Sequence, residues 1–378
     1  MLGLHGCKSV PKTAENTANT SAVYTPPSPK TGQWQPVPLQ SLPRWGEDTL
    51  GDIVPAMLQN CAYLAKQKAY AATWKTPCEA LKTVPQQNET AIRTWVQQYL
   101  NAYEHSAKAG IPSAAGIATG YFEPVYEGRL NDGSMNAQEV RRFRFPLHAP
   151  PILKADKVPS RADIAANPAL AGAPVAWLEN PIDAFLVHVQ GSTRIRLADG
   201  STRQVGFAGK NGLQYASIAN TLIAQGVFKS SEASMDNIRR WAAVRSDADV
   251  QAVLNTNPSY IYFRLLADKA DSKNTGAAQL GPIGAAGLPL TTQRSVAVDA
   301  TEIPLGAPLW VNITPAKNAN PAHTTAAFNR MMIAQDTGSA IVGANRIDYF
   351  WGTGAGAGNA ASAMKNAVKV WLLWPKPQ

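Results

Sequence analysis

The sequence predicts a mainly β protein with added helices, and three observations lead to this fold class. Several short segments are apolar with a period of two, turn-forming Gly, Pro, Asn and Asp residues separate them, and their connections differ in length. In the last third of the chain, strands are expected over residues 295–298, 308–313, 330–335, 347–351 and 368–373. Many short strands with irregular connections are typical of small barrels rather than of a doubly wound sheet.

The remaining elements follow from the same periodicities. Apolar residues at helical spacing predict helices over residues 48–67 and 89–105, with Asn88 as the N-cap of the second and a break over 73–77. Strands are expected over residues 117–125, 185–189, 194–197, 204–207 and 260–265, with a turn at Asp199 and Gly200. Two or three further helices, over residues 213–224, 235–244 and 247–254, precede the last of these strands.

The composition is that of a globular protein with room for two domains. The chain has 378 residues, of which 45% are hydrophobic and 16% charged, so it can bury a substantial core. The formal net charge is +9, yet Lys and Arg form no long run. A diffuse positive charge favours an anionic polymer as partner and not sequence-specific binding of nucleic acid, although simple solubility explains it equally well. No apolar stretch approaches the ~20 residues that span a membrane.

The N-terminal residues resemble the end of a lipoprotein signal peptide. Gly6 precedes Cys7 and Leu4 lies three residues upstream of it, but the basic and most of the apolar part of a signal peptide are missing. Either the start is truncated and Cys7 carries a lipid, which we favour, or Cys7 is incidental. Residues 8–43 contain seven prolines, so we expect residues 1–43 to be a tether. The other two cysteines, Cys61 and Cys78, fit a disulfide in an exported protein, with two buried thiols as the alternative.

Two aspartates near the C-terminus lie at the edges of apolar runs. Asp336 follows a strand and Asp348 stands beside Ile, Tyr, Phe and Trp residues. Partial desolvation and a second nearby carboxylate both raise the pKa of a carboxyl group, as a general acid requires. The alternative is that both side chains only bond loop amides at strand ends. Asp336 also begins Asp-Thr-Gly-Ser, the tetrapeptide of aspartic proteases, but a chain with one copy would have to dimerise through it.

No cofactor is predicted. The five histidines are scattered without the spacing of metal ligands, and no glycine-rich string has the context of a nucleotide-binding loop.

Seven groups of residues occur in the order found in one enzyme family. They are TGYFEP (119–124), FLVHVQGS (185–192), GFAGKNG (206–212), NPSY (257–260), GPIG (281–284), VD with IPLG (298–299 and 303–306), and QDTGSAI with DYFWG (335–341 and 348–352). In these strings the chain resembles the membrane-bound lytic murein transglycosylase A family over residues 42 to 374. The three aspartates that name the family's C-terminal domain correspond to Asp299, Asp336 and Asp348.

This resemblance implies a particular domain organisation. A double-psi β-barrel is expected from two chain segments, residues 44–125 and 259–376, and a smaller β domain is expected to be inserted between them, over residues 126–258. The glycan would lie in the groove between the two domains.

The resemblance also implies an activity. Such an enzyme cleaves the β-1,4 bond between N-acetylmuramic acid and N-acetylglucosamine in peptidoglycan and leaves 1,6-anhydro ends, without a cofactor. Asp348 would be the single general acid and base, since the C6 hydroxyl of the substrate replaces water, and Asp299 and Asp336 would adjust its pKa. If the reaction were hydrolytic, Glu123 would be its partner. Residues expected to contact the glycan are Thr119, Tyr121, Gln190, Ser192, Lys210 and Tyr215.

The implied surroundings are those of the bacterial envelope. The expected partners are glycan strands and other cell-wall enzymes, and the expected location is the periplasm of a Gram-negative bacterium, with an outer-membrane anchor if Cys7 is acylated. Besides the protease, a wall-binding protein without catalysis stays open as a different class.

Overall fold

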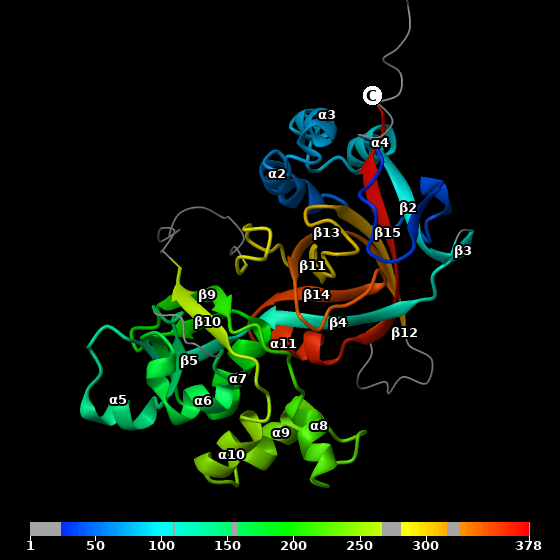
Figure 1. The fold of residues 1–378 in the computed structure, drawn as a ribbon. Helices are drawn as coiled ribbons and strands as arrows, with labels where there is room; N and C mark the ends of the chain where they lie inside the picture. The colour runs from blue at the N-terminus through cyan, green and yellow to red at the C-terminus, as the bar shows by residue number, and fades with distance from the viewer. Residues whose placement is uncertain (1–23, 109, 153–157, 267–280, 316–324, 378) are drawn as a thin grey trace, which may run out of the picture.

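Six strands close into a barrel in the computed structural model, which describes residues 24–108, 110–152, 158–266, 281–315 and 325–377. The strands are β4 (Gly116–Glu123), β11 (Ser295–Val298), β12 (Pro308–Pro315), β13 (Phe328–Thr337), β14 (Arg346–Thr353) and β15 (Lys365–Pro375). Their order is β15-β12-β13-β11-β14-β4, and the pairing of β4 with β15 closes the ring. The predicted barrel of two separated chain segments is confirmed, because β4 comes from the first segment and the other strands come from the second (Figure 1).

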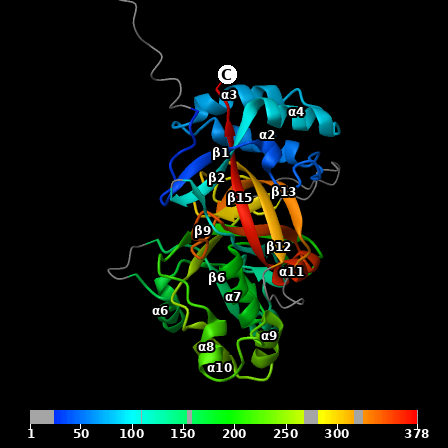
Figure 2. The same cartoon turned by 90° about the vertical axis from the view of Figure 1, so that its right-hand side faces the viewer.

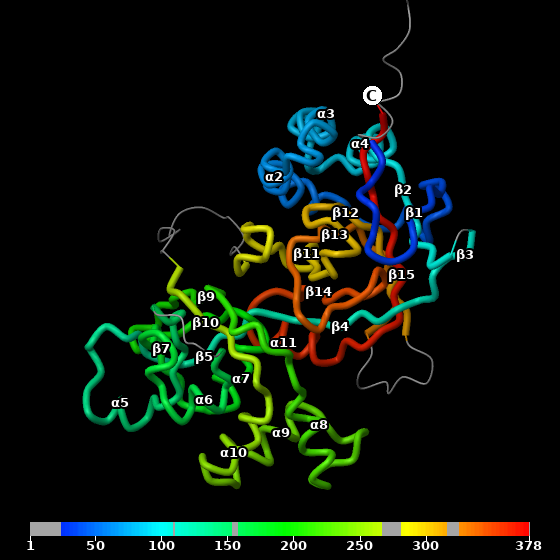
Figure 3. Tube along the Cα trace, viewed as in Figure 1, coloured from blue at the N-terminus to red at the C-terminus, as the bar shows by residue number. Residues whose placement is uncertain are grey.

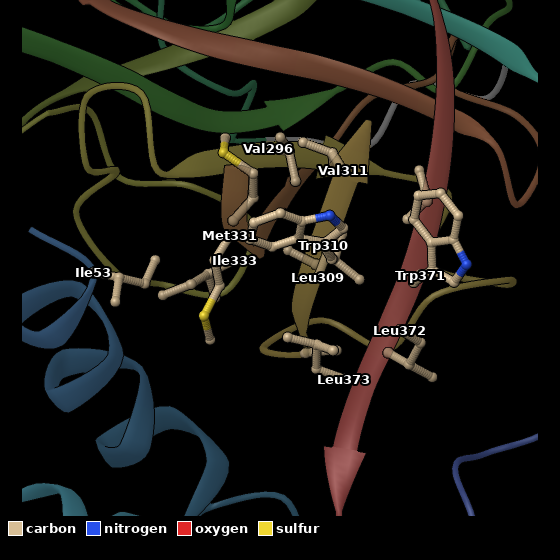
Figure 4. Close-up of a cluster of buried hydrophobic side chains, with 14 of the residues drawn as sticks. Ile53, Val296, Leu309, Trp310, Val311, Met331, Ile333, Trp371, Leu372 and Leu373 are labelled. Carbon is tan, nitrogen blue, oxygen red and sulfur yellow. The ribbon is translucent and has the colours of Figure 1, made fainter. Parts of the chain in front are cut away.

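The barrel encloses a continuous apolar core. Strand β11 pairs with β13 in parallel and β14 with β4 in parallel, while the other barrel pairs are antiparallel. Trp310 and Met331 are fully buried, and Figure 4 shows them among the aliphatic side chains of β11, β12 and β13. On one side Ile53 of helix α2 (Ile53–Leu64) points toward this cluster. Burial of so many apolar side chains is the main force that holds the barrel together.

Helices cover one end of the barrel. These are α2, α3 (Ala71–Leu81) and α4 (Glu89–Tyr99), and a disulfide between Cys61 and Cys78 joins the first two, as predicted. The predicted break at 73–77 is wrong, because α3 continues through Pro77. A proline inside a helix costs about 3 kcal/mol, and the burial of Trp74 and Cys78 offsets this cost. None of the helices in the described part of the chain is both long and apolar enough to cross a bilayer.

The helix predicted over residues 89–105 ends early. It stops at Tyr99, and the following residues form strand β2 (Leu100–Lys108), which pairs with β15. The spacing of Leu100 and Tyr103 fits a helix equally well. These residues form a strand because β15 offers backbone hydrogen-bond partners along this edge, and they pair with it in antiparallel register. The first helix is also shorter than predicted, since it begins at Ile53 rather than at residue 48.

Part of the expected tether belongs to the folded domain. Strand β1 (Gln33–Val37) pairs antiparallel with β2, and the hydroxyl of Thr31 donates to the carboxylate of Glu302 at 2.8 Å. The folded structure therefore begins before residue 44. Cys7, like all of residues 1–23, lies outside the described residues. The short strand β3 (Ile111–Pro112) extends this sheet by pairing with β2.

A second sheet lies beside the barrel, at the lower left of Figure 1 and below the barrel in Figure 2. Its strands, in spatial order, are β10 (Ile261–Leu265), β9 (Thr202–Lys210), β8 (Thr193–Arg196), β5 (Val125–Leu130), β7 (Pro174–Leu178) and β6 (Phe145–His148). The helices here are α5 (Ala137–Arg142), α6 (Arg161–Ala166), α7 (Pro181–Gln190), α8 (Ile218–Ala224), α9 (Met235–Ala242) and α10 (Asp247–Leu254). We call this unit the insert. Only Pro124 separates β4 of the barrel from β5 of the insert, and Figure 3 shows the chain passing directly from one to the other.

The strand predicted over residues 185–189 is wrong. These residues lie in helix α7, where the side chain of Asn180 accepts from the amides of Ile182 and Asp183 and Pro181 occupies the first turn. Gly191 ends the helix with a φ of 81°. The apolar run is long enough for either structure, and these capping residues favour the helix.

Candidate functional site

Four neighbouring strands bring the key side chains into one row across the barrel. Ala297 of β11 is paired with Asp336 of β13 on one side and with Asp348 of β14 on the other. Asp348 is in turn paired with Thr119 of β4. Because the residues on either side of Asp348, Ile347 and Tyr349, are buried in the barrel core, Asp348 projects from the opposite face of its strand. Two aspartates that lie 12 residues apart in sequence thus meet through strand register.

Asp348 is held by a short hydrogen-bond chain. The hydroxyl of Thr119 donates to its Oδ1 at 2.6 Å, and Nη2 of Arg346 donates to that hydroxyl oxygen at 3.0 Å. Burial raises the pKa of Asp348, while the Thr119 hydroxyl and the positive charge of Arg346 act in the opposite direction without cancelling the rise. Asp348 is therefore a carboxyl group that takes up and releases a proton nearer to neutral pH than an exposed aspartate does.

Asp336 has more hydrogen-bond donors. Its Oδ1 accepts from the amides of Ala285 at 3.0 Å and Thr337 at 2.9 Å, and its Oδ2 accepts from the hydroxyl of Tyr121 at 3.0 Å. Burial nevertheless raises its pKa to about 6, and the nearby charge of Asp348 adds to the rise. Both aspartates thus have the raised pKa that the sequence predicted. The alternative prediction, that the side chain bonds loop amides, also holds for Asp336.

Tyr121 donates to Asp336 and lies close enough to Asp348 to feel its charge. Burial raises its pKa well above the usual value, and the negative charges of Asp336 and Asp348 raise it further. Its phenol therefore stays neutral and remains a donor. The ring lies 5.3 Å from that of Phe350, and these two residues form a small apolar cluster with Leu290, Ala297 and Ile341. This cluster removes water from the carboxyl groups and is the physical cause of their raised pKa values.

Asp299 lies in a different environment from the other two aspartates. Its Oδ2 accepts from the amide of Gly343 at 2.9 Å, and its Oδ1 accepts from the amide and hydroxyl of Thr301 at 3.0 and 2.7 Å. Burial tends to raise its pKa, but these donors outweigh that effect and lower it. An ionised carboxylate with three donors is suited to holding the loop before β14 in place, not to giving up a proton.

Glu123 is committed to the junction between the barrel and the insert. Its fully buried carboxylate accepts from Arg194 and Gln204 of the insert, both at 2.7 Å, and from Thr353 of the barrel at 2.9 Å. It also lies four residues along β4 from Thr119, which corresponds to about 13 Å at the rise of a strand. The paired carboxylates of glycosidases are about 5 to 9.5 Å apart. Glu123 therefore does not fit the second carboxylate of a hydrolase.

The other predicted glycan contacts lie in the insert. Gln190, at the end of α7, accepts from the amide of Phe122 at 3.1 Å and so holds this helix against β4. Ser192 is buried, whereas Lys210 at the end of β9 and Tyr215 before α8 are exposed. The structure therefore places Thr119 and Tyr121 at the carboxyl groups, with Gln190 beside the same strand.

Sequence reasoning missed Arg346. It stands two residues before Asp348 and so shares its face of β14, and its guanidinium also donates to the backbone oxygens of Ile117 and Ile347. The alternation of the strand could have identified it, since residues i and i+2 project to the same side.

Comparison with known proteins agrees with this arrangement. Residues 117–264 match the family model described as the MltA specific insert domain, and residues 294–374 match the 3D domain. The chain is 34% identical over 261 residues to the membrane-bound lytic murein transglycosylase A of Vibrio cholerae, an alignment that covers 68% of this chain. It spans 65% of that relative, just under two thirds of its length.

Two solved structures are similar over most of the chain. The lytic transglycosylase LtgG of Burkholderia pseudomallei is 34% identical, with a TM-score of 0.59, and the match covers 93% of this chain and 100% of that one. MltA from Neisseria gonorrhoeae is 28% identical, with a TM-score of 0.72, and the match covers 91% of this chain and 93% of that one. With both characteristic domains in the same order and the same fold, the chain belongs to the membrane-bound lytic murein transglycosylase A family.

Proposed function

We propose that this protein is a lytic transglycosylase that cleaves the bond between N-acetylmuramic acid and N-acetylglucosamine and forms 1,6-anhydro ends. The observation that supports this most directly is the buried carboxyl group of Asp348 with its raised pKa. It is buried and bonded to Thr119, whereas Glu123, the carboxylate proposed for a hydrolase, is fully engaged elsewhere. A reaction with an internal nucleophile needs only one acid and base, and this site offers that.

Asp348 acts twice in the proposed reaction. In its protonated form it donates its proton to the glycosidic oxygen, and the bond from that oxygen to C1 of N-acetylmuramic acid breaks. The C6 hydroxyl of the same sugar then forms a bond to C1 and gives its proton to the Asp348 carboxylate, which restores the starting form. The hydroxyl is already part of the bound substrate, so its correct placement replaces the capture of a water molecule.

The neighbouring residues keep this proton available. The Thr119 hydroxyl and Arg346 stabilise the carboxylate after the first transfer, and the apolar cluster around Phe350 favours its protonated form before it. The two effects shift the pKa of Asp348 in opposite directions. The pKa is therefore neither too low for the acid to hold a proton nor too high for the carboxylate to form. Asp336 and Tyr121 contribute a second charge and a neutral donor beside the same substrate position.

The proposed substrate and surroundings follow from the same assignment. Peptidoglycan strands would lie across the row of strands that holds Asp348 and extend toward α7 of the insert, where Gln190, Ser192, Lys210 and Tyr215 are our proposed contacts. The relative from Vibrio cholerae is named as a membrane-bound enzyme, and we propose an envelope location in the periplasm for this protein. A lipid on Cys7 would provide attachment to the outer membrane, and other cell-wall enzymes are proposed partners.

Digestion of purified sacculi tests the assignment. We expect mass spectrometry to find soluble muropeptides with 1,6-anhydro ends, and Asp348→Asn to abolish their release while its circular dichroism spectrum shows the fold intact. Glu127→Gln, at an exposed pair with Arg196, is the matched control and should keep full activity.

Other outcomes would contradict the proposal in different ways. Products with reducing ends would indicate a hydrolase, and binding of sacculi without soluble products would indicate a wall-binding protein. Peptide cleavage that requires Asp336 but not Asp348, and that pepstatin blocks, would indicate a protease.

A further inference from the structure

A separate cavity lies inside the insert. It has a volume of about 610 Å³, and residues of helices α6, α7 and α10, of strands β6 and β7, and just before β10 line it. All of its lining residues lie between positions 144 and 260, so neither aspartate of the row described above contributes to it. Cavities of this size with mostly apolar walls are typical of small-molecule binding sites.

A buried cation without a counter-charge faces this cavity. Arg161 is only 5% exposed, and its guanidinium lies over the rings of Phe185 and Tyr260, at 4.8 and 5.0 Å from their centres. One of its nitrogens donates to the carbonyl oxygen of Ser259 at 2.9 Å, but its Nε has no hydrogen-bond partner. No carboxylate among the described residues forms an ion pair with it. Burying an unpaired charge is costly, and an anion in the cavity would remove that cost.

No other lining group compensates this charge. His148 and His188 also line the cavity, and burial lowers the pKa of His148 to about 4 and that of His188 well below the usual value, so both are neutral near pH 7. His188 Nδ1 accepts from the amide of Ile261 at 3.1 Å, so its proton lies on Nε2. Burial lowers the pKa of Arg161 to about 10, which leaves it positive at neutral pH. The lining contains no Asp or Glu.

The remaining walls define the rest of the ligand. Trp177 lines the cavity, and its buried Nε1 has no hydrogen-bond partner. Ile164, Leu254 and Phe185 provide aliphatic and aromatic surface around it. At one edge Arg144 forms an ion pair with Asp247, so its charge is already satisfied. A single free guanidinium matches one carboxylate through two parallel hydrogen bonds, whereas a phosphate dianion would need more positive charge.

We propose that this cavity is a binding site for a monocarboxylate with an apolar body, whose carboxylate pairs with Arg161 and whose body contacts Phe185 and Trp177. The carboxylate can belong to a free amphiphile or to the C-terminus of a wall peptide, because both offer the same chemistry.

Calorimetric titration of the full chain tests this site with three probes: octanoate, its neutral analogue octanamide, and acetyl-D-alanyl-D-alanine. We expect octanoate to bind at least about tenfold more tightly than octanamide, as a charge-assisted bidentate pair contributes at least that factor. The third probe identifies the source. If it binds and competes with octanoate, the natural carboxylate is that of a wall peptide; if it does not, the ligand is a free amphiphile.

Four variants locate the site. Arg161→Gln should weaken octanoate binding at least about tenfold, and Ala184→Phe, which fills the cavity from α7, should do the same if Arg161→Gln proves too unstable to purify. Arg144→Gln is the matched control and should bind octanoate normally. Asp348→Asn should also bind it normally, which separates this site from catalysis. Equal affinities for octanoate and octanamide, no binding of any probe at millimolar concentration, or normal binding by Ala184→Phe would overturn the proposal.

Discussion

The hydrogen bond from Thr119 to Asp348 leads to a specific prediction for the pH dependence of catalysis. Thr119→Val keeps the shape of the side chain but removes the donor at 2.6 Å, and with it the link to Arg346. This donor stabilises the carboxylate form and lowers the pKa of Asp348. A hydrogen bond to a charged group contributes about 1.5 to 3 kcal/mol, and one pKa unit corresponds to about 1.4 kcal/mol. We therefore expect the pKa of Asp348 to rise by about 1 to 2 units.

The sign of the effect on rate follows from the role of the acid. In the proposed reaction the first transfer needs protonated Asp348, so activity should fall as the pH rises through its pKa. In Thr119→Val the alkaline limb of kcat/KM, measured by the release of muropeptides from sacculi, should move to higher pH by about 1 to 2 units. The maximal rate should fall, because the carboxylate formed in the first step is less well stabilised.

Thr119→Ser is the matched control for this variant. It retains the hydroxyl, and its pH profile should stay within a few tenths of a unit of the parent. An unchanged alkaline limb in Thr119→Val, or a shift to lower pH, would refute the assignment of Asp348 as the acid that Thr119 adjusts.

Three further predictions concern stability. The pKa of Asp336 is raised to about 6 in the folded state. Its contribution to the free energy of unfolding is therefore complete below its unfolded-state pKa near 4 and is lost as the pH rises toward 6. In urea unfolding between pH 4 and 7 this loss should be on the order of 3 kcal/mol, and Asp336→Asn should show a much smaller one. Glu123→Gln removes the buried charge that accepts from Arg194, Gln204 and Thr353 and should lower the free energy of unfolding by about 3 to 5 kcal/mol, without producing reducing-end products. Reduction of the Cys61–Cys78 disulfide, which spans 17 residues, should lower it by about 3 kcal/mol, and alkylation after reduction should make the loss permanent.

Much of the barrel could be predicted because its strands are short and strongly apolar. The strand expected over residues 295–298 is observed as Ser295–Val298. In the insert, the helix expected over residues 247–254 is observed as Asp247–Leu254. Errors arose where an apolar run fitted both periodicities. The segment 185–189 became a helix through the caps around it, and the residues after Tyr99 became a strand because β15 offered a partner. Local pattern alone does not contain that information.

The sequence by itself determined the chemistry that this chain carries: three aspartates in a family pattern, two of them beside apolar residues, and a cysteine pair. Only the tertiary structure decided the environment of each carboxylate. Strand register places Asp336 and Asp348 on either side of Ala297, and the packing of Tyr121 and Phe350 keeps water from them. The same folding engages Glu123 with Arg194 across the junction. A carboxylate's pKa depends on the water and donors within a few ångströms of it, and those come from strands that are distant in sequence.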